Sequence, residues 1–422
     1  MSAVGPAYGR VFWLDGGGAR DWSGRLSYLG WLEPGEVSLT YDAHSRTVFE
    51  HTGTSSRVVG DDIFTVLESR LRTGGSPRSQ GRFDGWVGYF GYACRPDLPA
   101  LVEPSTTPDA MWMQASRYAV FDHQRHTVRL HGIDVLPQAD PALISTGPDR
   151  IDAPAYSAYL PGFQRVQQEL RAGNSYEVNL THRVTVRSEA DPVAAYLRLR
   201  RINPAPYAAF LQHEGTAVLS SSPERYVTIG ADASIETRPI KGTTPRGLDP
   251  VKDRTLRDLL RTDPKLRSEN LMVTDLLRND LSIVCLPGTV EVPQLMHVES
   301  YPSVHQLITT IRGVLRPDVN GVAATRALFP GGSMTGAPKR RTMQIISEVE
   351  QTPRGVYSGA IGWIGDDGRA DLGIVIRSLV ASRGRYVLGT GGGITVRSDP
   401  EQEYAETQWK TERLIQALHP GP

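Results

Sequence analysis

Cysteine is scarce in this sequence, since Cys94 and Cys285 are the only two among 422 residues. Two distant cysteines provide neither a disulfide framework nor the ligand spacing of a zinc site. Net charge is also absent, because Lys and Arg together number 46 and Asp and Glu also number 46. This balance argues against nucleic acid or an anionic membrane as the main partner. It leaves room for a small anionic ligand, which needs only a few local cations.

Long apolar runs are missing as well. No stretch approaches the roughly 20 apolar residues that cross a bilayer, and the N-terminal sequence MSAVGPAYGRVFWLDGG lacks the basic-then-apolar pattern of a signal peptide. We found no convincing internal repeat and no low-complexity block. We therefore expect a protein of the reducing cytoplasm, with neither nucleic acid nor membrane among its partners.

The chain is long enough for one large fold with two lobes. The stretch LPQADPALISTGPDRIDAPAY, Leu136–Tyr156, is rich in Pro, Ala and Asp and has weak periodicity. We place a boundary there, between an N-terminal lobe at 1–150 and a catalytic region at 151–422. Strand-like segments dominate and do not alternate regularly with helices, which predicts an α+β fold of antiparallel sheets flanked by helices. Helical spacing and end signals predict helices at Pro154–Ala172, Asp249–Arg261, Ser268–Leu281, Pro338–Glu350 and Pro400–Leu418.

The segment SYEVNLTHRVTVR alternates in the manner of a strand. Its apolar face carries Tyr176, Val178, Leu180, Val184 and Val186. The opposite face carries Glu177, Asn179 and Thr181. Such a polar face either meets water or lines a pocket, and the pattern alone does not decide between the two.

Lys241 lies in an unusually stiff segment, ETRPIKGTTPRG. Pro239 and Pro245 restrict the backbone on either side of it, and Gly242 follows it directly. A surface lysine needs no such restriction. The pattern is typical of a lysine whose amino group must be aimed.

Two acidic clusters could hold a hard cation. In SDPEQEYAETQWKTERLIQAL, Ser398 and Glu401 match a capping box, which starts a helix that presents Glu403 and Glu406 on one face. In RSENLMVTDLLRND, Glu269 is expected to open another helix. Magnesium needs only one or two carboxylates from each element. Glutamates in a first helical turn are also favoured by the helix dipole, so the pattern is not diagnostic.

Two glycine-rich segments invite comparison with phosphate loops. In LFPGGSMTGAPKRR, Gly336 is followed by Ala337 and Pro338, so the Walker pattern is absent. We interpret this segment as a tight turn that leads into a helix. In TGGGI, Thr390–Ile394, bare backbone N–H groups could approach a carboxylate. An ordinary turn is the alternative for the second segment.

Taken in order, these motifs resemble the chorismate-utilising enzymes. The family includes anthranilate synthase component I, aminodeoxychorismate synthase component I, isochorismate synthase and salicylate synthase. The resemblance covers about Ala155 to Leu418 and is looser before that, where GWVGYFGY is similar to the N-terminal lobe. It implies large antiparallel sheets packed in layers with helices outside. It is carried by the segments SYEVNL, SSSPER, ETRPIKGT, ENLMVTDLLRNDL, VHQLITTIRG, LFPGGSMTGAPKRR, YSGAIGW, IVIRSL and GGGITVRSDPEQEYAET.

Within the family, Lys241 is the discriminating position. Aminodeoxychorismate synthases resemble this chain in having PIKGT, whereas anthranilate synthases have alanine at the lysine position. Isochorismate and salicylate synthases carry a lysine base where this chain has Glu177. The resemblance thus implies formation of 4-amino-4-deoxychorismate from chorismate and ammonia, with Lys241 as a covalent nucleophile. Such an amine must be neutral, and we expect partial desolvation to lower its pKa.

The resemblance also assigns the acid and the metal ligands. Glu224 in SSSPER corresponds to the general acid that protonates the departing hydroxyl. Glu269 and Glu406 correspond to direct ligands of Mg²⁺, with Glu403 nearby or bound through water. The metal would hold the ring carboxylate and withdraw electrons from the diene.

The substrate contacts follow in the same way. Arg377 and Tyr357 would hold the enolpyruvyl carboxylate, because a guanidinium can bind two oxygens. A structural ion pair for Arg377 and a core position for Tyr357 are the alternatives. The substrate's carboxylates would also meet backbone and hydroxyl groups of Gly242, Thr243, Gly391, Gly392 and Gly393.

Some features depart from the family pattern. Gln306 in VHQL replaces a histidine of some relatives, and we assign no catalytic role to the neighbouring His305. Glu177 replaces an expected glutamine, so it could tune Lys241 or meet the substrate. Neither YACRP nor IVCLP resembles a glutaminase nucleophile, so ammonia is expected from a separate glutamine amidotransferase subunit. The product would serve 4-aminobenzoate and folate or a secondary metabolite. Alternatives are anthranilate or isochorismate synthesis, and a non-catalytic chorismate-binding protein.

Overall fold

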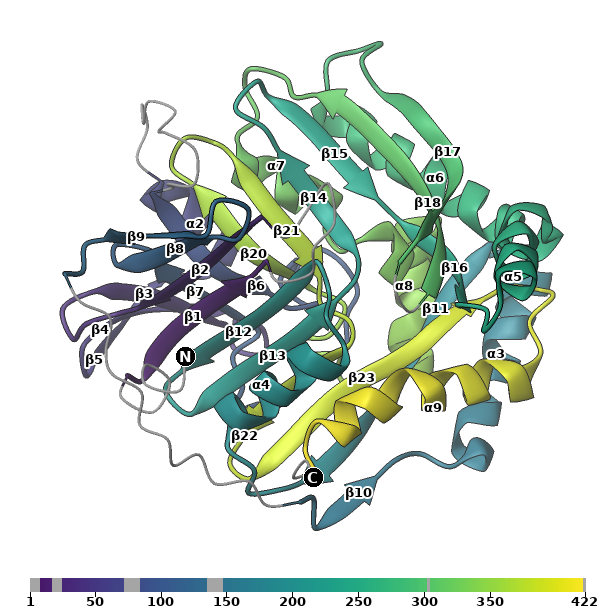
Figure 1. The fold of residues 1–422 in the computed structure, drawn as a ribbon, viewed down its shortest axis with the longest axis horizontal. Helices are drawn as coiled ribbons and strands as arrows, with labels where there is room; N and C mark the ends of the chain where they lie inside the picture. The colour runs from purple at the N-terminus through teal and green to yellow at the C-terminus, as the bar shows by residue number, and fades with distance from the viewer. Residues whose placement is uncertain (1–7, 17–24, 72–83, 135–146, 302–303, 420–422) are drawn as a thin grey trace.

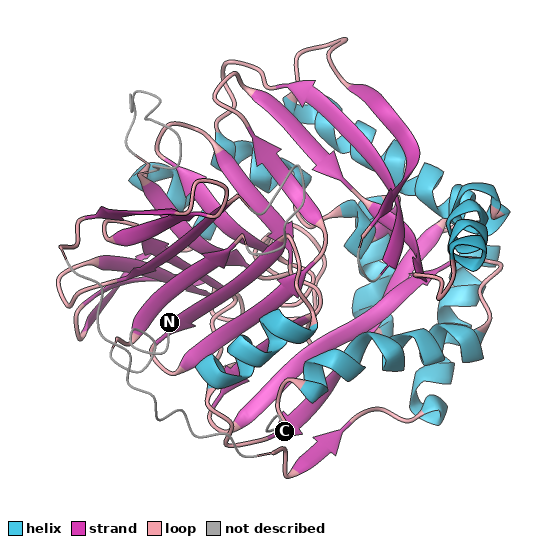
Figure 2. Cartoon of the chain, viewed as in Figure 1, coloured by secondary structure: helices cyan, strands magenta, loops and turns pink. Residues whose placement is uncertain are grey.

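The computed structural model describes residues 8–16, 25–71, 84–134, 147–301 and 304–419. Within them, strands form two large antiparallel sheets that pack face to face, and helices cover the outer faces (Figures 1 and 2). This arrangement confirms the α+β layered sandwich expected from the sequence.

The first sheet ends at β9 on one side and at β10 on the other. Its spatial order is β10 (Arg150–Asp152), β11 (Glu177–Arg187), β23 (Arg385–Ile394), β22 (Ser378–Ser382), β13 (Thr216–Ser222), β12 (Tyr207–His213), β1 (Arg10–Asp15), β2 (Leu26–Trp31), β8 (Tyr118–Asp122) and β9 (Thr127–His131), with β19 (Gly336–Ala337) also paired to β11.

The second sheet runs from β16 to β5. Its spatial order is β16 (Ile240–Pro245), β18 (Val304–Val314), β15 (Ser234–Arg238), β14 (Arg225–Ile229), β21 (Ala370–Ile374), β20 (Ala360–Gly365), β6 (Gly85–Phe90), β7 (Ala110–Gln114), β3 (Val37–Asp42), β4 (Thr47–Thr52) and β5 (Ser55–Gly60), with β17 (Glu291–Ser300) also paired to β18.

Both sheets combine strands from the two sides of residue 150. Strand β1 pairs with β12 in the first sheet, and β6 pairs with β20 in the second. Part of the predicted boundary segment, residues 136–146, lies outside the described residues. The division into two domains stays a prediction, and each sheet contains strands from both sides of the predicted boundary.

Strand β6 shows how the layers are held together. Its side chains alternate between the two faces of the sheet. Val87 and Tyr89 pack in the apolar layer between the sheets, whereas Trp86 and Phe90 pack on the helical side. The helices on that side are α2 (Ile63–Arg70), α6 (Pro264–Val284) and α7 (Gly321–Leu328).

The first sheet is covered by helices in the same way. Apolar side chains of α4 (Pro192–Ile202) and α9 (Pro400–Gln416) pack on its outer face, and α9 runs along β23 (Figure 1). Helices α3 (Tyr156–Arg171) and α8 (Lys339–Val349) pack on β11. Helix α5 (Pro250–Thr262) contacts β16, β17 and β18, and the short 3₁₀ helix η1 spans Gly332–Met334.

One helix start and one helix cap near the acidic clusters differ from the sequence prediction. Helix α6 begins at Pro264 rather than Ser268, because the Asp263 carboxylate caps it by accepting from the Leu266 N–H at 2.9 Å. Glu269 therefore lies inside this helix and does not open it. In α9 the cap is Asp399, whereas Ser398 accepts from the Thr395 N–H instead. The predicted capping box is thus wrong by one residue.

Two further expectations from the sequence concern disulfide bonds and membrane-spanning helices. Cys94 and Cys285 are both buried and free, as expected from their number and spacing. Among the described helices, none has the length and apolar character needed to traverse a bilayer.

Candidate active site

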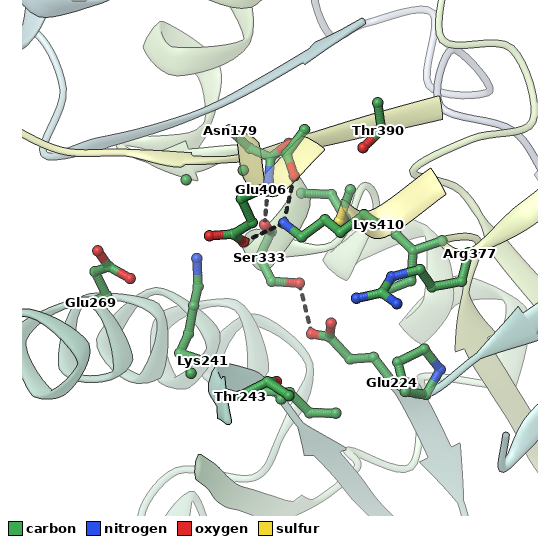
Figure 3. A pocket seen from close by; sticks show the side chains of 18 of the residues that line it. Asn179, Glu224, Lys241, Thr243, Glu269, Ser333, Arg377, Thr390, Glu406 and Lys410 are labelled. Atoms are coloured by element: carbon green, nitrogen blue, oxygen red, sulfur yellow. Dashed lines mark hydrogen bonds and ion pairs between the residues drawn. The ribbon is translucent and has the colours of Figure 1, made fainter. Parts of the chain in front are cut away.

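A cavity of about 480 Å³ is lined by residues from the ends of the two sheets and from α6 and α9. Figure 3 shows side chains from several distant parts of the chain converging on it. Every residue that the sequence analysis assigned to catalysis, substrate or metal lines this one cavity. These residues are Glu224, Lys241, Gly242, Thr243, Glu269, Tyr357, Arg377, Gly391, Gly392, Gly393, Glu403 and Glu406.

Lys241 reaches the cavity from the edge strand β16. Its side chain is only 11% exposed and points toward the carboxylates (Figure 3). Gly242 has φ +94°, in the left-handed region that favours glycine, and a Cβ there would lie 3.1 Å from Leu266. The rigid corner noted in the sequence therefore directs the amine inward.

The polar face of β11 points into the protein and not into water. Asn179 lines the cavity, Glu177 pairs with Lys241, and Thr181 donates to Glu350 through its N–H and hydroxyl. All three are buried. Tyr176 was expected on the opposite, apolar face, but it precedes β11 and is 66% exposed.

The protonation of Lys241 differs from the expectation. Burial alone lowers its pKa, but the carboxylates of Glu177, Glu269 and Glu224 and the hydrogen bond to Glu177 outweigh burial and raise it. In the ligand-free protein the side chain is therefore an ammonium group. The predicted lowering of this pKa is wrong for that state, because three acidic side chains from distant segments surround the amine.

The surroundings of Glu224 favour its neutral form, whereas those of Lys241 favour the charged form. Glu224 is buried, and the Ser333 hydroxyl donates to its Oε1 at 2.9 Å. Burial raises its pKa to about 7, although the Ser333 hydrogen bond and the Lys241 charge act against the shift. A carboxyl group that still holds its proton near neutral pH can act as a general acid.

At the mouth of the cavity, the acidic side chains of Glu269, Glu403 and Glu406 pair with two lysines. Lys265 Nζ lies 3.1 Å from Glu403 Oε1 and 3.9 Å from Glu269 Oε1. Lys410 donates to Glu406 and to the Gly391 carbonyl, at 2.6 and 2.7 Å. As they stand, no three acidic, histidine or cysteine side chains in the described parts of the chain are arranged to hold a metal ion.

The donor set nevertheless fits a hard cation. Glu269 Oε1 is buried without a hydrogen-bond partner, and burial raises the pKa of this carboxyl to about 7. The Lys265 ammonium already occupies the space between Glu269 and Glu403, so the cluster attracts positive charge. Carboxylate oxygens are the ligands that Mg²⁺ prefers.

Arg377 contributes a cation to the cavity wall. It has φ +50°, an uncommon backbone conformation for a non-glycine residue. Its guanidinium stacks over Trp409 at 5.2 Å from the ring centroid. Within the described residues it makes no side-chain hydrogen bond or ion pair, which argues against the structural alternative for this arginine.

Tyr357 and the glycine strand complete the inner wall. The Tyr357 ring packs so closely on Gly389 that a Cβ there would lie 2.1 Å from the ring, and the Arg183 guanidinium covers it at 4.9 Å. Residues 391–393 of β23 continue past the last residue of β23 that pairs with β22. One edge of this backbone therefore faces the cavity.

Sequence reasoning missed several cavity residues. Lys265 lies four residues before Glu269, and Lys410 lies four residues after Glu406. Residues four apart share one face of a helix, so this spacing could have revealed both lysines. Ser333 lay within a quoted motif without a role. Gln306 lines the cavity with an unpartnered Oε1. His305 instead bonds Asp253 and Ser300 and does not line the cavity.

Comparison with known proteins places these observations in context. The family model described as chorismate binding enzyme matches residues 31–416. The aminodeoxychorismate synthase of Streptomyces pristinaespiralis is 40% identical over 96% of this chain, which spans 61% of that protein's length. Aminodeoxychorismate synthase component 1 of Escherichia coli K12 is 34% identical over 99% of this chain and 100% of that protein. The crystal structure of anthranilate synthase component I from Streptococcus pneumoniae is similar with a TM-score of 0.81, at 25% identity, covering 92% of each chain.

Proposed function

The chain belongs to the family of chorismate-binding enzymes, and from this premise we propose that it converts chorismate and ammonia into 4-amino-4-deoxychorismate. The observation that carries the proposal is the position of Lys241 inside the cavity, opposite a carboxyl group with a raised pKa, that of Glu224. A nucleophile and an acid on one cavity can add to one end of a diene and remove hydroxide from the other.

The reaction proceeds in two additions. The neutral Lys241 amine forms a bond to C2 of chorismate, the two ring double bonds shift, and the C4–O bond breaks. Glu224 gives its proton to the departing oxygen, which leaves as water. Ammonia then forms a bond to C4, the double bonds shift back, and the C2–N bond breaks to release the lysine amine. The new C4 ammonium returns a proton to Glu224.

The cavity also supports assignments for binding. We infer that Arg377 and Tyr357 receive the enolpyruvyl carboxylate, because the Arg377 guanidinium makes no ion pair in the described part of the chain. Carboxylates of Glu269, Glu403 and Glu406 would hold Mg²⁺, with the ring carboxylate next to it. When bound, the ion would withdraw electrons from the diene. The lysines at the mouth would then release their acidic partners.

Removal of divalent metal should stop the reaction. After treatment with EDTA, we expect turnover of chorismate to fall by about tenfold or more, since the ring carboxylate loses its counter-charge. Adding Mg²⁺ back should restore the rate, and adding the same ionic strength of NaCl should not. Unchanged turnover in EDTA, with the melting curve also unchanged, would argue against the metal assignment.

The product distinguishes this proposal from its alternatives. The protein should be incubated with chorismate, Mg²⁺ and ammonium at alkaline pH, where free ammonia is abundant. We expect 4-amino-4-deoxychorismate, which a purified aminodeoxychorismate lyase converts to 4-aminobenzoate. Anthranilate or isochorismate as the product would support a sibling activity. Intact chorismate would support a binding protein.

The source of ammonia is a further part of the proposal. The E. coli relative carries the name component 1, which implies a second component. Both cysteines of this chain are buried and unsuited to glutamine hydrolysis. We therefore assign ammonia supply to a separate glutamine amidotransferase subunit, acting in the cytoplasm.

A further inference from the structure

Glu177 stands behind Lys241 at the start of β11. It is 3% exposed, and its Oε1 accepts a hydrogen bond from Lys241 Nζ in an ion pair. Glu177 does not line the cavity itself. Any effect on the substrate therefore passes through the lysine amine.

The backbone at Gly393 leaves space for the ion pair between Glu177 and Lys241. At Gly393, a Cβ would lie 2.1 Å from Glu177 Oε1 and 3.0 Å from Lys241 Nζ, so a side chain there would displace the pair. Glu177 is also fixed in register opposite Ala337 of β19. Segments that are distant in the sequence thus leave room for one carboxylate and one amine.

The other acidic side chains near Lys241 are arranged differently. Glu224 accepts from Ser333, and Glu269 Oε1 has no hydrogen-bond partner. In the described part of the chain, only Glu177 lies within ion-pair distance of Lys241 Nζ. The carboxylates that act on the amine come from four elements or loops: Glu177, Glu224, Glu269 and Glu406. Lys265 and Lys410 act on the neighbouring carboxylate of Glu406.

We propose that Glu177 accepts the proton of the Lys241 ammonium before the amine adds to the ring and returns it after the amine is released. The inference rests on the proposed covalent role of Lys241. Proton transfer within the pair leaves a neutral amine and a neutral carboxyl, with no net change in charge. The released amine then recovers the same proton, so the pair returns to its starting state after each cycle.

This role resolves the conflict between a raised lysine pKa and a neutral nucleophile. The resting ammonium is favoured by its neighbours, yet its proton has a buried acceptor in direct contact. Since the proton stays within the pair, forming the neutral amine should add no dependence on the bulk pH across the range in which the pair holds one proton. The loss of the Glu224 proton, whose pKa is about 7, slows the wild type and the Glu177 variants alike above that pH. Without Glu177, the proton must leave to solvent.

The test is the pH dependence of the first half of the reaction. Wild type, Glu177→Gln and Glu177→Asp are mixed with chorismate and Mg²⁺ without ammonia, and formation of the Lys241 adduct is timed by intact mass between pH 6 and pH 8. We expect the wild-type rate to fall only as Glu224 loses its proton, and each variant is compared with wild type at the same pH. Glu177→Gln should be slower than wild type by roughly 10²–10³-fold near pH 7, and this deficit should shrink about tenfold per pH unit as the pH rises. Glu177→Asp keeps a carboxylate and should show a reduced rate whose ratio to the wild-type rate does not change with pH.

The outcomes separate this inference from the proposed function. No adduct on wild type would overturn the covalent role of Lys241 and the inference with it. An adduct on wild type, together with the wild-type rate at every pH in Glu177→Gln, would overturn the inference alone. If Glu177→Gln does not fold, as judged by its melting curve, Glu177→Asp decides. A ratio to the wild-type rate that rises with pH in that variant then contradicts transfer to the carboxylate.

Discussion

Replacing Lys241 with alanine is expected to reduce formation of 4-amino-4-deoxychorismate by roughly 10⁴-fold or more. In the proposed reaction the amine forms the bond to C2 that makes the C4 hydroxyl leave, and its loss removes that bond. Lys265 and Lys410 are occupied by Glu403, Glu406 and the Gly391 carbonyl. The rate is measured with ammonium as the nitrogen source, which removes any dependence on a partner subunit.

The variant needs controls because it also leaves Glu177 buried without its cation. Loss of one partner of a buried pair destabilises proteins by several kcal/mol, so melting curves must accompany the kinetics. Lys252→Ala removes an exposed lysine of α5 and should leave the rate unchanged. If folded Lys241→Ala retained more than about a tenth of wild-type turnover, the covalent role would be refuted.

Replacing Glu224 with glutamine should have the second largest effect on activity. The amide keeps the size of the side chain and can still meet Ser333, but it cannot give a proton to the departing hydroxyl. General acids contribute about 10²–10⁴-fold to rate, and a loss in that range is expected. Turnover at saturating chorismate is the measurement, because the effect belongs to the chemical step. A wild-type rate would exclude this acid.

The same substitution should stabilise the protein at alkaline pH. The pKa of Glu224 is about 7 in the folded state, above its ordinary value of 4.5. Between these values the folded state holds more protons than the unfolded state, so stability falls as pH rises, by about 3 kcal/mol at most. Glutamine cannot ionise and escapes this loss. Urea unfolding at pH 5 and pH 8 should show the variant gaining on wild type at pH 8, and an equal difference at both would contradict the raised pKa.

Much of the fold was accessible from the sequence because its signals are local. Period-two alternation identified β11, and proline and acidic caps located α5, α8 and α9 to within two residues. Capping was less certain where two suitable residues are adjacent, as with Ser398 and Asp399. The pairing of β1 with β12 joins segments about 200 residues apart, and no local pattern specifies it.

The candidate site was also predictable only where its signals are local. Ordered motifs indicated which residues would meet, and the cavity brings them together. The charge on Lys241 was not predictable, because it depends on carboxylates contributed at positions 177, 224 and 269. Likewise, Glu177 points toward the amine and away from water because of how β11 pairs with its neighbours. The alternation of residues along the strand does not specify this pairing.

The most direct measurement is the intact mass of the protein after incubation with chorismate and Mg²⁺ but no ammonia. We expect a gain equal to chorismate less one water, located on the peptide that contains Lys241 and lost when ammonium is added, with release of the aminated product. An unmodified protein that still forms 4-amino-4-deoxychorismate once ammonium is supplied would contradict a lysine-bound intermediate.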